Sequence, residues 1–227
     1  MSDEARKWVL VEVCDPSVTR GLYICWFQMD PRTGRWFLSW AAHIPDGPIS
    51  TMAEMVKQER RFIRPGAPEV CIMDAKGGAF RIDKERDENW FDRFRAYGLD
   101  YVPNDEPSPL EELDEWFKLT WDPVLGKPLP RLMICERVAA IPHGPLWALQ
   151  RFRYDPIGMS HKAFLQQPGK DWIDTMKYFV NQRSINRKRL SKDREAARGR
   201  SRLRHTKLAQ SYGFGARPRI MRLPSYR

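Results

Sequence analysis

The chain has 227 residues, of which 42% are hydrophobic and 12% aromatic, so it can build one ordinary domain with an appendage and falls outside the disordered class. No run reaches the roughly 18 apolar residues of a membrane span, and the charged start lacks the apolar segment of a signal peptide, so we expect a cytoplasmic protein with no membrane partner. The net charge of +10 is unevenly placed, because residues 184–227 carry 14 Lys/Arg and only two acids. This asymmetry predicts a polyanionic partner for the tail.

The chain opens with three short apolar runs, rich in β-branched and aromatic residues, at 8–14, 21–28 and 36–42. The first is expected to stop at Asp15-Pro16, and the second is followed by the turn residues 30–35. Three consecutive strands joined by tight turns predict an antiparallel meander.

Helices and strands then alternate along the chain. The expected helices are residues 50–61, 88–97, 110–120, 144–154 and 170–183, and the expected strands are residues 69–73, 99–103 and 131–135. This order predicts an α/β fold in which a mixed sheet, an antiparallel meander followed by parallel strands, is flanked by helices. Residues 1–183 are expected to form this domain, and residues 184–227 a basic C-terminal tail that is partly helical or disordered.

Acidic residues follow two of the expected strands and open the last helix. Asp15 comes after the first strand and Asp74 after the strand 69–73. Asp171 and Asp174 are three residues apart, which places both on one face of the helix 170–183. Taken singly, each acid is also what a turn or a helix cap uses.

Converging carboxylates repel one another unless a cation lies between them, and oxygen ligands suit Mg²⁺ or Mn²⁺. Two such ions can activate a water molecule and stabilise the leaving oxygen of a phosphodiester. The acids therefore indicate a divalent-metal centre for phosphodiester hydrolysis, with their use as turn and cap residues as the alternative.

The chain resembles the nuclease domain of the large terminase subunit of tailed bacteriophages, the motor-nuclease that cuts concatemeric DNA during packaging. The resemblance is carried by four segments in order: Asp15-Pro16 with Gly21; Met73-Asp74-Ala75-Lys76-Gly77-Gly78; residues 131–135 leading into residues 146–154; and Lys170-Asp171-Trp172-Ile173-Asp174-Thr175-Met176-Lys177-Tyr178. It implies a ribonuclease H-like fold and a nuclease that cuts double-stranded DNA with two divalent ions, Mg²⁺ or Mn²⁺.

Carried over by position, the resemblance makes Asp15 and Asp74 the first two catalytic metal ligands. The third is Asp171 or Asp174, with Asp171 preferred. The family often has two adjacent acids preceded by His at this helix start, whereas this chain has Lys170-Asp171-Trp172.

The resemblance also implies partners in genome packaging. A full large terminase carries an ATPase, but Gly126-Lys127-Pro128 lacks the first glycine and the hydroxyl of a phosphate-binding loop. We therefore expect the ATPase motor as a separate domain or subunit, with the portal and the small terminase as further partners, in an infected or lysogenic bacterial host.

Basic residues beside the acids and in the tail are expected to bind DNA phosphates in a salt-dependent way. They are Lys76, Arg187, Lys188, Arg189, Arg198, Arg200, Arg202 and Arg204. The leading hypothesis is a DNA endonuclease of low sequence specificity. The alternatives are a non-catalytic DNA-binding or motor-assembly module and, more remotely, another ribonuclease H-like enzyme such as a transposase or resolvase.

Overall fold

Three antiparallel strands form the first part of the sheet in the computed structural model. The structure describes residues 8–17, 19–63, 67–79, 81–83, 88–104, 110–152 and 167–181. The three strands are β1 (Val9–Ser17), β2 (Gly21–Met29) and β3 (Trp36–Ile44). β1 pairs with β2 without interruption from Val9↔Met29 to Ser17↔Gly21, and β2 pairs with β3. The predicted meander is confirmed.

The first strand runs further than its sequence predicts. Asp15 and Pro16 lie within β1, since pairing with β2 continues to Ser17. On its other side β1 pairs with β4 (Val70–Asp74), and this pairing ends at Cys14↔Met73. Pro16 lies beyond that last pair, so its missing N–H interrupts no hydrogen bond between β1 and β4.

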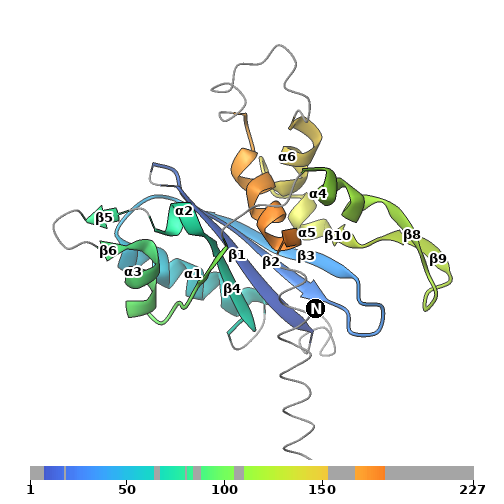
Figure 1. Cartoon of the computed structure of the whole chain (residues 1–227), viewed down its shortest axis with the longest axis horizontal. Coiled ribbons are helices and arrows are strands. Elements are labelled where there is room, and N and C mark those ends of the chain that lie inside the picture. Colours follow the sequence, from blue (N-terminus) through green and yellow to red (C-terminus); the bar gives the residue numbers. More distant parts are fainter. Residues whose placement is uncertain are drawn as a thin grey trace, which may run out of the picture. The chain divides into compact units, whose positions relative to one another are not determined.

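Three further strands join this meander in parallel. β4 (Val70–Asp74) pairs with β1, β7 (Val102–Asn104) with β4, and β10 (Leu132–Ile134) with β3. The result is a six-stranded sheet in the order β10-β3-β2-β1-β4-β7 (Figure 1). The predicted α/β class, with an antiparallel meander followed by parallel strands, is confirmed.

Helices cover both faces of the sheet, because alternate strand residues point to opposite sides. Leu10 and Cys14 of β1 pack toward α1 (Ile49–Ile63) and α3 (Trp90–Ala96). Val11 and Val13 pack toward the other face. That face is covered by α4 (Leu110–Phe117), α5 (Glu136–Ala139), α6 (Pro145–Arg151) and the helical residues 170–181 (Figure 1).

A buried carboxylate ties β1 to the first of these layers. Glu12 is fully buried and accepts hydrogen bonds from Arg60 Nε at 2.6 Å and Arg60 Nη2 at 2.7 Å. Trp26 Nε1 donates to it at 2.7 Å and Tyr101 Oη at 2.5 Å. Strand β1, helix α1 and the segment before β7 are thereby held to one another.

A hairpin follows α4, and its first strand begins where the sequence predicts the end of a helix. The helix expected over residues 110–120 ends at Phe117, and β8 (Leu119–Asp122) pairs with β9 (Lys127–Pro130). The turn forms because the Asp122 carboxylate accepts the N–H groups of Val124 and Leu125 at 2.9 and 3.0 Å.

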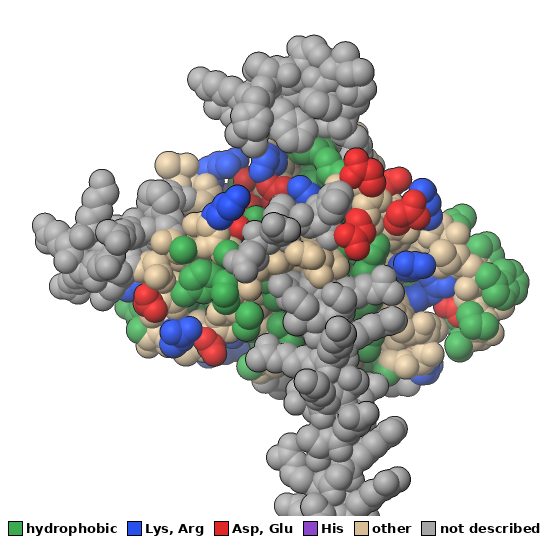
Figure 2. All heavy atoms as spheres, in the orientation of Figure 1, with side chains coloured by type: hydrophobic (Ala, Val, Ile, Leu, Met, Phe, Trp, Pro, Cys, Tyr) green, Lys and Arg blue, Asp and Glu red, His purple; other side chains and the backbone are tan. Residues whose placement is uncertain are grey.

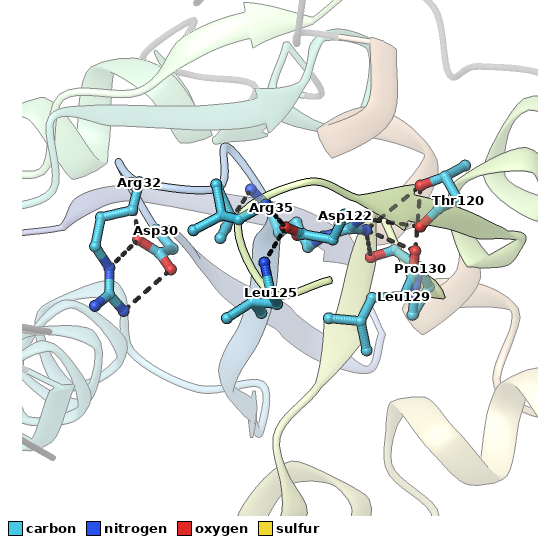
Figure 3. A network of polar contacts seen from close by, with 10 residues as sticks. Asp30, Arg32, Arg35, Thr120, Asp122, Leu125, Leu129 and Pro130 are labelled. Carbon is cyan, nitrogen blue, oxygen red and sulfur yellow. Dashed lines mark hydrogen bonds and ion pairs between the residues drawn. The ribbon is translucent and has the colours of Figure 1, made fainter. Parts of the chain in front are cut away.

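Arg35 attaches this hairpin to the sheet (Figure 3). Its side chain pairs with Asp122 and donates to the carbonyls of Leu129 at 2.6 Å, Pro130 at 2.5 Å and Thr120 at 3.1 Å. The outer side of the hairpin keeps large apolar side chains exposed, at one end of the view in Figure 2. They are Leu119, Trp121, Val124 and Leu125.

Short elements complete the fold: α2 (Ala75–Gly78), β5 (Arg81–Asp83) and β6 (Glu88–Asn89). The described residues all belong to the unit Met1–Arg183, and the predicted tail 184–227 lies outside them. Within the described part of the chain, none of the helices has the length and apolarity needed to pass through a bilayer.

Candidate functional site

Two neighbouring strands place Asp15 and Asp74 side by side. Cys14 of β1 pairs with Met73 of β4, and each acid is the next residue along its strand. The residues just before Cys14 and Met73 are Val13 and Ile72, and both face the layer that contains helix 170–181. Because side chains alternate, Asp15 and Asp74 point to that same face.

The helix 170–181 lies over this end of the sheet. Phe179 stacks on Phe27 of β2 with ring centroids 3.8 Å apart, and Trp172 Nε1 donates to the His143 carbonyl at 3.0 Å. Asn104 of β7 donates to the Tyr178 carbonyl at 3.1 Å. Asp171, Asp174 and Tyr178 are three and four residues apart, so they share one side of this anchored helix.

Asp74 has two fixed hydrogen-bond donors. Tyr178 Oη donates to its Oδ1 at 2.7 Å, and the Gly77 N–H donates to its Oδ2 at 2.6 Å. Asp74 is thus the N-cap of α2. A side chain at residue 77 would crowd this cap, since a Cβ there would lie 2.9 Å from Asp74 Oδ2 and 3.0 Å from Pro16 Cγ. The Lys76-Gly77-Gly78 stretch therefore lets the chain turn closely against Asp74.

The two helix acids pair with basic side chains. Arg20, in the turn between β1 and β2, contacts Asp171 Oδ2 through Nη1 at 2.8 Å. Asp174 pairs with Lys170 and, at 3.3 Å, with Lys177. Asp15 differs from the other acids, because no hydrogen bond or ion pair to its carboxylate is found within the described residues.

The four carboxylates act on one another electrostatically. Burial raises the pKa of Asp15 well above its usual value, and repulsion from Asp174, Asp171 and Asp74 raises it further, in that order. Burial also raises the pKa of Asp171, against the lowering effect of Arg20 and Lys170. The acids predicted from the sequence therefore lie within electrostatic range of Asp15, at the end of strands β1 and β4.

The placement stops short of a complete metal cage. Among the residues that the structure describes, no three Asp, Glu, His or Cys side chains are grouped closely enough to hold a metal ion. Arg20, Lys170 and Lys177 supply the positive charge next to Asp171 and Asp174 instead.

The predicted DNA-binding residues divide into two groups. Lys76 is exposed in α2, two residues past Asp74. The tail residues Arg187, Lys188, Arg189, Arg198, Arg200, Arg202 and Arg204 lie outside the described residues.

The sequence reasoning missed the partners of the acids. Lys170 and Lys177 lie four residues before and three after Asp174, a spacing that alone predicts helical ion pairs. The contact of Tyr178 with Asp74 spans 104 residues, and no local pattern signals it.

Comparison with known proteins identifies the fold but no family. No protein-family model matches the chain, and no curated protein sequence matches it. Among solved structures, it is similar to the large terminase from a thermophilic bacteriophage, with a TM-score of 0.51 over 78% of this chain and 10% identity. The chain spans 40% of that protein's length. At this identity the likeness concerns the fold, which is terminase-like and, by its strand order, ribonuclease H-like.

Proposed function

We propose that this chain is a divalent-metal-dependent endonuclease that cuts double-stranded DNA with little sequence preference during viral genome packaging. One observation carries the proposal. Four carboxylates from β1, β4 and helix 170–181 gather at one end of a sheet whose fold is similar to that of a phage large terminase.

The donor set suits Mg²⁺ or Mn²⁺. Asp15 is partly buried, is repelled by three other carboxylates and has no direct ion pair within the described residues, so a divalent cation would offset a repulsion that the site retains. Asp15, Asp74 and one helix acid would hold it. When bound, Mg²⁺ or Mn²⁺ supplies the activation of water and the stabilisation of a leaving oxygen that phosphodiester hydrolysis needs.

Asp174 is the better candidate for the third ligand. Of the three neighbouring acids, it has the largest effect on the pKa of Asp15. Both helix acids already pair with basic side chains, Asp171 with Arg20 and Asp174 with Lys170 and Lys177. The electrostatics thus favour Asp174 over Asp171, which the sequence pattern prefers.

Other residues of the chain would orient the site and the DNA. Tyr178 and the Gly77 N–H hold the Asp74 carboxylate in one orientation. Arg20 has half of its side chain exposed, and Lys76 is exposed beside Asp74, so both suit contacts with DNA phosphates.

The packaging context is also part of the proposal. The basic tail 184–227 would bind DNA or dock on the portal. An ATPase motor domain or subunit and the small terminase would complete the assembly, in the cytoplasm of a bacterial host.

Plasmid digestion tests the proposal. We expect the wild-type chain to nick or linearise plasmid with Mg²⁺ or Mn²⁺ and to be inactive in EDTA. Asp74→Asn and Asp174→Asn should abolish cleavage, whereas Asp114→Asn, the same charge change at an exposed position of α4, should not. Full activity of Asp74→Asn with Mn²⁺ would exclude this assignment of the site.

A non-catalytic DNA-binding or motor-assembly module is the second candidate. It is favoured by the internal partners of the acids, since Asp74 caps α2 and Asp174 pairs with two lysines of its own helix. A chain that shifts DNA in gels at low salt but cuts none with either ion would support this candidate.

A further inference from the structure

Lys170 is the basic residue most closely associated with the acids. It is the first residue of helix 170–181, and its Nζ pairs with Asp174 Oδ2 one helical turn further on. Its side chain is 21% exposed, so most of it is buried. The neighbouring cations are placed differently: Arg20 pairs with Asp171, and Lys177 approaches Asp174 from the next turn of the helix.

The charge of Lys170 acts on three of the four acids. It pairs directly with Asp174, and it lowers the pKa of Asp15 and of Asp171 against the effect of burial. Its ammonium therefore holds the Asp174 carboxylate, one of the groups that the proposed divalent ion would need.

We infer that Lys170 is an internal counter-cation of Asp174 that competes with the divalent ion for this carboxylate and has to release it before that ion binds. This inference rests on the proposed function, and it concerns how the same site is loaded. An ammonium and a divalent cation compete for the same carboxylate oxygens, and the lysine side chain is a point charge on a flexible stem that can swing toward solvent. Lys170 thus stabilises the metal-free site and weakens its affinity for the ion.

The inference predicts opposite effects on stability and on metal affinity. Without the ammonium, Asp15, Asp171 and Asp174 repel one another in the metal-free protein, so the melting temperature in EDTA should fall. Removing the Lys170 ammonium also removes a competitor for the Asp174 carboxylate and a positive charge that repels the ion. Mn²⁺ should therefore bind about tenfold more tightly. A lysine that only supports the helix would lower stability equally with and without the ion.

Mn²⁺ titration by calorimetry, together with thermal unfolding in EDTA and in Mn²⁺, tests the inference on the full chain. Lys170→Met removes the charge and keeps most of the stem, and Lys170→Arg keeps the charge. Lys118→Met is the matched control, because Lys118 forms an exposed pair with Glu115 outside the site. We expect tighter Mn²⁺ binding and a melting temperature that Mn²⁺ restores for Lys170→Met only. Lys170→Arg should bind Mn²⁺ as the wild type does.

The outcomes separate this inference from the proposed function. Equal Mn²⁺ affinity of the wild type and Lys170→Met overturns the role of Lys170 and leaves the metal site intact. The absence of Mn²⁺ binding by the wild type and by every variant overturns both. Binding that appears in Lys170→Met and disappears in the double variant Lys170→Met/Asp74→Asn supports both. If Lys170→Met does not fold in EDTA, its refolding on addition of Mn²⁺ supports the inference, and failure to refold overturns it.

Discussion

The substitution Arg60→Met should destabilise the domain strongly while leaving the proposed site unchanged. Arg60 is 8% exposed and donates two hydrogen bonds to Glu12, which is fully buried beneath α1. Methionine keeps the apolar stem and removes the guanidinium. The Glu12 carboxylate would then remain buried with Trp26 and Tyr101 as its remaining donors.

The expected magnitude follows from that uncompensated charge. Removing one partner of a buried ion pair costs about 3–5 kcal/mol, against a total free energy of unfolding of about 5–15 kcal/mol for a typical protein. For a domain of this size, a loss of 1 kcal/mol lowers the melting temperature by about 2–4 °C, so a fall of roughly 6–20 °C is expected. Replacing Glu12 as well, in Glu12→Gln/Arg60→Met, should recover part of the loss because the buried charge is then gone.

Urea unfolding followed by tryptophan fluorescence and circular dichroism measures the effect. Arg61→Met is the control, since Arg61 is exposed on the same helix and its replacement should change the free energy of unfolding by less than about 0.5 kcal/mol. Plasmid cleavage by folded Arg60→Met should equal that of the wild type, because Glu12 and Asp15 face opposite sides of β1. An Arg60→Met variant within about 1 kcal/mol of the wild type would refute this view of the network.

Two further predictions concern the other charged side chains. Asp15→Asn, measured in EDTA, should be more stable than the wild type at pH 7. The raised pKa of Asp15 means that the folded chain binds its proton more tightly than the unfolded chain, so the wild type loses stability as the pH rises above about 3.9. The difference in the free energy of unfolding between Asp15→Asn and the wild type should vanish as the pH falls to that value. An equal difference at pH 4 and pH 7 would contradict the prediction. Arg35→Met should release the β8–β9 hairpin from the sheet. The amide hydrogens of the hairpin should then exchange faster, while those of β1 should exchange at the same rate as in the wild type. Unchanged exchange in the hairpin would show that Arg35 does not anchor it.

Much of the sheet was predictable because its signals are local. The β-branched and aromatic runs at the start of the chain predict an antiparallel meander, which the structure confirms in β1, β2 and β3. Asp15 and Asp74 each follow a short apolar run, which predicts them just past strand ends; in the structure Asp15 lies inside β1 and Asp74 is the last residue of β4. Helix spacing likewise placed Asp171 and Asp174 on one side of the last helix.

The β8–β9 hairpin shows where local signals fail. Residues 119–130 carry three prolines and a glycine, which favour a linker, yet they pair as strands. Their conformation depends on Arg35, which lies 85 to 95 residues away and donates to three of their carbonyls. A buried guanidinium needs several acceptors, and the hairpin supplies them only once the sheet has formed.

The sequence by itself determined the strand order of the meander, the two strand acids and the candidate pair on the last helix, because each depends on residues a few positions apart. Only the tertiary structure decided which charges meet. Tyr178 reaches Asp74, Arg20 reaches Asp171, and Lys170 acts on acids from two elements, because strands β1 and β4 end beneath the same helix. Electrostatic interactions act through space, so residues far apart along the chain settle the charge balance of the site.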